Sequence, residues 1–356
     1  MPRLLLFLLV VLLAGCELAA SPDADRVVAG VDLDVLFEPA SAAEMAAVEA
    51  EWATRDVSPA DVQVLQTTPA TIAGVSVQVQ IVGHAVDGVR HYGAVVTPTG
   101  FGAGELPVLV YAHGGDSGLD MNEAAAVFEL FPQIVSDFVI VMPSFRDEPL
   151  RFGGQTWMSD GPASPWDRDV DDALALLNTA LDIEPSADAS RIGVLGFSRG
   201  GAVGMLMALR DDRIDGVVDF FGPTDFFGPF VQEVFTEALL GSPRDLPGLD
   251  VLNERFVAPL AAGALTIDDV RLELVRRSPA LWARDLPRMQ VHHGTADAIV
   301  PVSQTEHLMD AMAAIGRTAP SFEAFIYTEP GAGHNPLLLP GSLVRARTFV
   351  LELAAQ

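Results

Sequence analysis

Lysine is absent from this sequence: all 21 basic residues are arginine, and against 48 acidic residues they leave a formal net charge of −27. Such an acidic surface repels the phosphate backbone of DNA and RNA, so nucleic acid is not an expected partner. Charged residues make up only 19% of the chain and apolar residues 50%. That balance excludes a largely disordered protein and leaves ample material for a core.

Cysteine occurs once, at position 16, so no intrachain disulfide can form. Long apolar runs are also missing except at residues 4–13, which are too short for the roughly 20 residues that a membrane-spanning helix needs. This run follows Arg3 and ends in Leu-Ala-Gly-Cys16, which resembles the lipobox of bacterial lipoproteins. The resemblance implies that residues 1–15 are a signal peptide and that Cys16 carries a lipid anchor. The protein is then an exported lipoprotein of the cell-envelope membrane; the alternative is an ordinary secretory signal.

Residues 17–40 show no clear period and predict a tether, and Ser41 with Glu44 forms a capping box that opens a short helix to about Trp52. Residues 16–65 are therefore interpreted as a tether and a short helix. Residues 75–81 alternate strictly between apolar and polar, and Asp87-Gly88 predicts a hairpin turn into residues 90–97.

Beyond residue 100, short apolar runs alternate with helical patterns. The expected strands are 107–112, 138–142, 191–195, 216–221, 289–292 and 322–327. The expected helices are 123–135, 169–181, 200–209, 304–315 and 343–353. This alternation predicts an α/β domain over residues 66–356, with a mostly parallel sheet and helices on both faces. Between about 225 and 277 the alternation stops, which predicts a helical cap over the carboxyl ends of the strands.

The sequence Gly196-Phe197-Ser198-Arg199-Gly200 lies between a predicted strand and a predicted helix. That setting is typical of the G-x-S-x-G nucleophile elbow, in which glycines make room for a strained serine. Ser198 is therefore the candidate nucleophile. Ser117, in Gly-Asp-Ser117-Gly, resembles the serine segment of trypsin-like proteases, but those are all-β proteins whose histidine and aspartate precede the serine.

In this type of site the acid and the histidine follow the serine in that order. His334 lies on a glycine-rich loop after the last predicted strand and is the candidate general base. Asp297, at the end of the strand before, is the candidate acid that orients it, and Asp225 is the alternative. His292, in a strand, and His307, in the middle of a helix, are interpreted as core or solvated residues. His293 precedes Asp297, against the expected order.

His113-Gly114-Gly115 ends an early predicted strand and can offer backbone N–H groups to an oxyanion. The N–H of Arg199 would be the second donor, and either Gly114 or Gly115 the first. His113 is interpreted as a brace for this loop. The sequence contains no metal-ligand spacing, phosphate-binding loop or dinucleotide fingerprint, so no metal or cofactor is expected.

Six segments carry a wider resemblance: His113-Gly-Gly, Pro143-Ser-Phe-Arg, Gly196-Phe-Ser-Arg-Gly-Gly, Arg277-Ser-Pro, His293-Gly-Thr-Ala-Asp-Ala-Ile-Val-Pro and Gly333-His. With them the chain, from about residue 107 onward, resembles the catalytic domain of the prolyl oligopeptidase family, within the α/β-hydrolase fold. The resemblance implies cleavage of a peptide or related acyl bond through an acyl-enzyme on Ser198. That family usually carries a large β-propeller, for which the roughly ninety residues between Cys16 and residue 107 leave no room.

Esterases similar to dienelactone hydrolases and acetyl esterases share this core without a propeller, so an esterase is the close alternative. A lipoprotein that binds a ligand without catalysis is the second alternative, because fold alone does not determine function.

Overall fold

The computed structural model describes residues 26–355, so the predicted signal peptide and Cys16 lie outside the described part of the chain. The strands are β1 (Val27–Val28), β2 (Val31–Asp32), β3 (Ala60–Ile72), β4 (Val75–Val86), β5 (Val89–Pro98), β6 (Leu106–Ala112), β7 (Leu119–Asp120), β8 (Val139–Pro143), β9 (Pro149–Phe152), β10 (Gln155–Met158), β11 (Ala187–Phe197), β12 (Ile214–Phe220), β13 (Arg288–Gly294) and β14 (Phe322–Tyr327). The α-helices are α1 (Leu33–Leu36), α2 (Ala42–Trp52), α3 (Met121–Phe128), α4 (Pro132–Asp137), α5 (Arg168–Ile183), α6 (Arg199–Ala208), α7 (Pro229–Leu239), α8 (Leu249–Leu252), α9 (Ala258–Ala261), α10 (Ile267–Arg276), α11 (Ser303–Ala314) and α12 (Ser342–Ala354). Short π- or 3₁₀-helical turns are η1 (Asn253–Val257), η2 (Pro279–Trp282) and η3 (Pro336–Leu338).

A nine-stranded sheet forms the centre of the protein, in the order β14-β13-β12-β11-β6-β8-β5-β4-β3. The six strands from β14 to β8 are parallel, whereas β5, β4 and β3 form an antiparallel edge. Helices α5, α6 and α11 belong to the core on one face, and α3, α4 and α12 to the core on the other. The mostly parallel sheet with helices on both faces is therefore as predicted. The Asp87-Gly88 turn joins β4 to β5 with φ of 52° and 74° at its two residues, the left-handed geometry of a tight hairpin.

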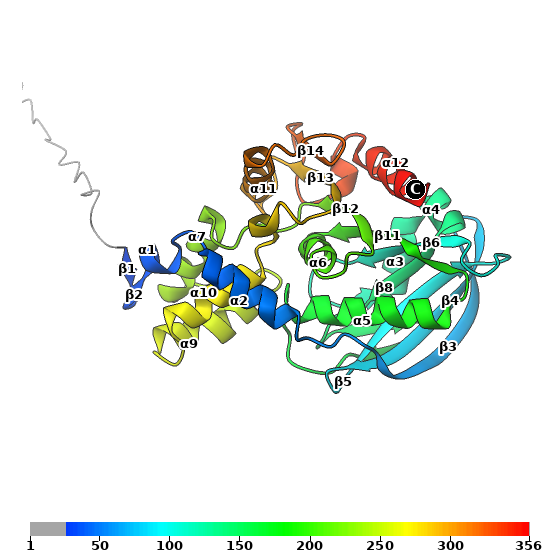
Figure 1. Ribbon diagram of the computed structural model, residues 1–356, viewed down its shortest axis with the longest axis horizontal. Helices are drawn as coiled ribbons and strands as arrows, with labels where there is room; N and C mark the ends of the chain where they lie inside the picture. Colours follow the sequence, from blue (N-terminus) through cyan, green and yellow to red (C-terminus); the bar gives the residue numbers. More distant parts are fainter. Residues whose placement is uncertain (1–25, 356) are drawn as a thin grey trace, which may run out of the picture.

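The cap consists of α7, α8, η1, α9 and α10, all between residues 225 and 277 as predicted. Figure 1 shows its helices to one side of the sheet, with α2 lying along them. None of the helices within residues 26–355 is long and apolar enough to cross a membrane.

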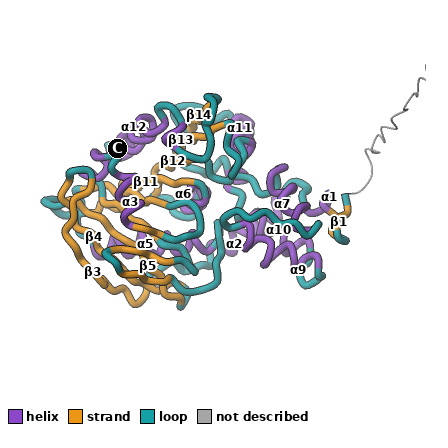
Figure 2. Tube along the Cα trace, turned by 180° about the vertical axis from the view of Figure 1, so that it is seen from behind, coloured by secondary structure: helices purple, strands orange, loops and turns teal. Residues whose placement is uncertain are grey.

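Residues 26–40 do not form the tether that the sequence predicted. They fold into β1, β2 and α1, and Figures 1 and 2 both place α1 beside the cap. Leu36 is fully buried, and the Phe37 ring meets the Phe235 ring of α7 edge-on at 5.4 Å. Arg271 of α10, itself only 3% exposed, donates hydrogen bonds to the carbonyls of Val35, Leu36 and Glu38. The buried guanidinium of Arg271 thus holds residues 26–40 against the cap. The sequence of this segment has no apolar period, so the sequence alone did not predict this contact.

Two further elements differ from the prediction. The helix expected over residues 123–135 is divided into α3 and α4, because Pro132 cannot continue a helix and instead begins the second one. Strand β3 was not predicted: its first residues are exposed on both faces at the sheet edge, so no alternation marks them. Because β3 begins at Ala60, the sheet starts before residue 66.

Candidate active site

Ser198 occupies a strained turn between β11 and α6. Its φ of 54° and ψ of −120° lie in a region that residues with side chains rarely adopt. A Cβ atom on Gly196 would lie 2.3 Å from the carbonyl oxygen of Gly200, and one on Gly200 would lie 2.0 Å from that of Ala112. Both positions therefore require glycine, and the strand-turn-helix setting predicted for Ser198 is present.

His334 and Asp297 are hydrogen-bonded to each other. Asp297 follows β13 and His334 follows β14, so adjacent parallel strands deliver the two side chains to the same edge of the sheet. The Nδ1 atom of His334 lies 2.7 Å from Oδ2 of Asp297. The other carboxylate oxygen, Oδ1, accepts the backbone N–H groups of Ile299 and Val300. The carboxylate therefore fixes the imidazole with Nδ1–H as the donor, and Nε2 is left for a substrate or nucleophile.

Asp297 is buried, which by itself would raise its pKa. Hydrogen bonds from His293 and His334 outweigh the burial and hold the pKa of this carboxyl well below its usual range. The side chain is therefore ionised at neutral pH, as an acid that orients a histidine must be.

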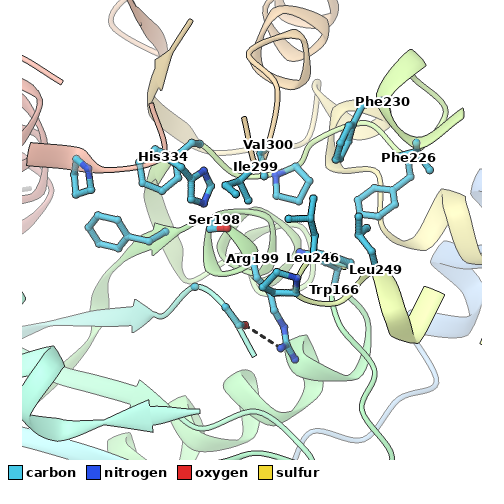
Figure 3. Close-up of a pocket in the computed structure, with 18 of the residues that line it drawn as sticks. Trp166, Ser198, Arg199, Phe226, Phe230, Leu246, Leu249, Ile299, Val300 and His334 are labelled. Carbon is cyan, nitrogen blue, oxygen red and sulfur yellow. Dashed lines mark hydrogen bonds between the residues drawn. The ribbon is translucent and has the colours of Figure 1, made fainter. Parts of the chain in front are cut away.

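Ser198 and His334 line one pocket, and Figure 3 shows their positions among its lining residues. The Phe221 ring packs against the imidazole of His334 with ring centroids 4.2 Å apart. The structure thus brings the three predicted residues Ser198, Asp297 and His334 to one site.

The alternative acid and nucleophile lie elsewhere. Oδ2 of Asp225 is 2.8 Å from Nδ1 of His307 on α11, and Oδ1 accepts the N–H of Phe227. Ser117 is exposed on a loop, where its carbonyl accepts a hydrogen bond from Arg151. Neither Asp225 nor Ser117 lines the pocket.

The two remaining histidines are core residues. His292 stacks between Phe220 and Phe325, and burial lowers the pKa of this imidazole to about 3. His293 is hydrogen-bonded to the hydroxyl of Thr305 and to the carbonyl of Val300. Both assignments agree with the prediction that neither is the general base.

Gly114, Gly115 and Arg199 also line the pocket, beside Ser198. A Cβ atom on Gly114 would lie 3.0 Å from Cβ of Ser198. The loop His113-Gly114-Gly115, called the glycine loop below, therefore passes directly against the serine. Nδ1 of His113 donates to the carbonyl of Gly114 at 3.0 Å, because a carbonyl can only accept. Burial lowers the pKa of His113 to about 4, so this imidazole is neutral and serves as the predicted brace.

The pocket has a volume of about 470 Å³, and the rest of its lining is mostly apolar. The aromatic and branched aliphatic residues that line it are Val127, Trp166, Phe197, Phe221, Phe226, Phe230, Val231, Leu246, Leu249, Ile299 and Val300. Figure 3 shows Phe226, Phe230, Leu246 and Leu249 of the cap region facing the cavity. The charged lining residue is Arg199, whose guanidinium is paired with Asp169 and Glu148. These pocket-lining residues were not predicted beyond the location of the cap.

Comparisons with known proteins agree with this architecture. Residues 154–238, which include Ser198 but neither Asp297 nor His334, match the dienelactone hydrolase family. No curated protein matched the sequence.

Similar solved structures span almost the whole chain. Acetyl xylan esterase 1 from Thermoanaerobacterium sp. JW/SL YS485 is 18% identical with a TM-score of 0.59, and the match covers 91% of this chain and 99% of that one. An acetyl xylan esterase from Paenibacillus sp. R4 is 17% identical with a TM-score of 0.59, covering 90% and 98%. An esterase from Pyrococcus furiosus is 16% identical with a TM-score of 0.53, covering 82% and 99%. The chain has the α/β-hydrolase fold that the sequence predicted.

Proposed function

We propose that this protein is a serine esterase that cleaves carboxylic esters with an apolar acyl or alcohol group. The observation that carries the proposal is that strained Ser198 and His334, which is paired with Asp297, line the same apolar pocket. The match to the dienelactone hydrolase family and the similarity to esterases of known structure support the same reaction class.

The reaction follows from the residues present. Ser198 Oγ attacks the ester carbonyl carbon as its proton passes to Nε2 of His334, and the carbonyl electrons move to the oxygen, which the N–H groups of the glycine loop and Arg199 stabilise. Collapse of this intermediate breaks the bond to the alcohol oxygen, which takes the proton from His334. A water molecule then attacks the acyl-enzyme in the same way and releases the acid and Ser198.

The resemblance to prolyl oligopeptidases makes peptide cleavage the second candidate. A peptide offers an N–H and a C=O at each residue, and burying them without partners is costly. The described lining of the pocket supplies few polar groups besides Ser198 and His334, and no carboxylate faces the cavity that could bind a substrate amine. The apolar lining therefore favours the ester.

We also propose that the protein is exported and held at the cell-envelope membrane through a lipid on Cys16. The support is the sequence alone: a short apolar run that ends in Leu-Ala-Gly-Cys16.

Covalent labelling tests the serine hydrolase. A fluorophosphonate should modify Ser198 in the wild-type protein and leave Ser198→Ala unmodified. The unlabelled wild-type protein should hydrolyse p-nitrophenyl esters of medium-length fatty acids faster than alanine or proline p-nitroanilides. Faster cleavage of the anilides would favour the peptidase, and a folded protein that resists labelling would favour the binding lipoprotein.

A further inference from the structure

Side chains hold both peptide groups that flank the Cα atom of Gly115. The preceding carbonyl, that of Gly114, accepts from His113 at 3.0 Å, and the carbonyl of Gly115 accepts from Nη1 of Arg199 at 3.2 Å. Gly115 has a φ of +74°, and no atom lies within 4 Å of the place where a Cβ would be. Packing on that side therefore does not restrain this glycine, whereas the two hydrogen bonds do.

These bonds also determine where the Gly115 N–H points. In a trans peptide the N–H is opposite to the C=O of the preceding residue. Because the Gly114 carbonyl points at the buried His113 ring, the Gly115 N–H points away from that ring, and Gly115 lines the pocket. The sequence did not decide which of Gly114 and Gly115 donates to the oxyanion. Gly115 is the one whose N–H is held in this way.

The Arg199 guanidinium is itself held in place by its own partners. Nε and Nη2 contact the two carboxylate oxygens of Asp169 at 2.7 and 2.9 Å, and Nη1 also contacts Glu148. Its Cζ lies 4.8 Å from the centre of the Phe145 ring, and the residue is only 3% exposed. Burial disfavours the charged form, but Asp169 and Glu148 outweigh it and raise the pKa of Arg199, so the group stays charged.

We propose that Arg199 is a positioning residue that couples the two backbone donors of the oxyanion hole. Its own N–H, at the first position of α6, is one donor. Its guanidinium fixes the peptide plane that follows the other donor, Gly115, relative to the same helix. This inference rests on the proposed function, because an oxyanion forms only if Ser198 attacks a carbonyl.

Donors that are held in place stabilise the tetrahedral intermediate more than the bound ester. Loss of the guanidinium should therefore lower kcat and leave KM nearly unchanged. Removing one oxyanion donor typically costs 100- to 1,000-fold in kcat, so loosening one should cost about 10- to 100-fold.

The variants to test are Arg199→Gln and Arg199→Lys. A pair of inhibitors separates stabilisation of the oxyanion from binding in the pocket. An alkyl trifluoromethyl ketone adds Ser198 Oγ to its carbonyl carbon, passes the serine proton to His334 and places an oxyanion in the hole. The matching methyl ketone fills the same pocket with much less tendency to add the serine. We expect the inhibition constant of the trifluoromethyl ketone to rise by about 10- to 100-fold, in step with the loss of kcat/KM, and that of the methyl ketone to change less than threefold.

Arg210→Gln is the matched control. Arg210 follows the other end of α6, and its side chain, which is only 6% exposed, pairs with Asp171 at 2.5 Å but makes no hydrogen bond to the glycine loop. The Arg210→Gln variant should have a lower melting temperature than the wild type but the same affinity for the trifluoromethyl ketone. If neither single variant at position 199 folds, Arg199→Met combined with Asp169→Asn and Glu148→Gln neutralises both buried carboxylates that would lose their partner and allows the same measurement.

The two hypotheses fail differently. A folded wild-type protein that does not react with a fluorophosphonate overturns the proposed function. A wild-type protein that reacts, together with folded position-199 variants that bind the trifluoromethyl ketone as tightly as the wild type, overturns only the role of Arg199. An equal loss of affinity in the Arg210→Gln control would also overturn it.

Discussion

Oδ2 of Asp225 lies 2.8 Å from Nδ1 of His307, and neither residue lines the pocket that holds Ser198. The acid that competes with Asp297 in the sequence therefore has an imidazole partner of its own. These two aspartate–histidine pairs provide an internal comparison, because the same chemical change can be made in each.

Ser198, His334 and Asp297 should behave as one unit. Ser198→Ala and His334→Ala should each lower kcat by about 10⁴- to 10⁶-fold, and the double variant should lose little more, since each change alone abolishes the same step. Asp297→Asn should cost less, and Asp225→Asn should stay within about threefold of the wild type. Hydrolysis of one activated ester measures all five proteins. Multiplicative losses in the double variant, or a crippled Asp225→Asn, would contradict the assignment.

Filling the apolar pocket should shorten the acyl chains that the enzyme accepts. Val231 of α7 lines the cavity, and Val231→Phe places an extra ring there. We expect kcat/KM to fall by about tenfold or more for an octanoate ester and by much less for an acetate, as a few methylene contacts are lost. Val251→Phe is the control, because Val251 belongs to the cap but not to this pocket. Equal losses on both esters would show that the acyl chain lies elsewhere.

Gly200 should not tolerate even a methyl group. In Gly200→Ala the new Cβ would meet the Ala112 carbonyl at 2.0 Å, and this backbone atom cannot move without displacing β6. We expect a loss of roughly 3 kcal/mol or more in the free energy of unfolding. Gly74→Ala meets no atom within 4 Å and carries only the strain of its φ of +77°, about 1 kcal/mol. Urea titrations of both variants check the difference.

The contact between Glu44 and Arg271 should make the stability of the protein sensitive to acid. The hydrogen bond from Arg271 lowers the pKa of Glu44 from 4.5 to about 2, against the opposing effect of burial. Because the folded pKa is the lower one, this stabilisation is complete above about pH 4.5 and is lost as pH falls toward 2.

Glu44→Gln should therefore cost about 1 kcal/mol near neutral pH and progressively less below pH 4.5. Thermal melts of both proteins from pH 7 to pH 3 measure the gap. A gap that widens on acidification would contradict the sign of this linkage.

The lipid anchor should depend on Cys16 alone. Expressed with its leader in a bacterium, the wild-type protein should incorporate labelled palmitate and partition into the detergent phase. Cys16→Ser should do neither and should accumulate as precursor or in the aqueous phase. Palmitate incorporated by the serine variant would show that the anchor, if any, is attached elsewhere.

The sequence predicted the parts of the site that local patterns mark. Ser198 lies in a motif of adjacent residues, and Asp297 and His334 each follow an apolar run that could be recognised as a strand. The partners of Arg199 carry no such mark: Asp169 and Glu148 are 30 and 51 residues away, and only the folded chain brings them together. The apolar lining of the pocket could not be predicted either, because Trp166 and Phe230 are residue types that also occur throughout an ordinary core.

Through Arg271 the cap is held against residues near the start of the chain, although more than 200 positions separate them in the sequence. By holding carbonyls in and just after the last turn of α1 and the carboxylate of Glu44, it makes residues 26–52 a second layer of the cap. A change before residue 52 is more than 140 positions from Ser198 along the chain, yet in space it alters the support of the cap helices that line the pocket. Variation in substrate preference among relatives of this protein can therefore originate in a stretch that, in an alignment, would look like a dispensable leader.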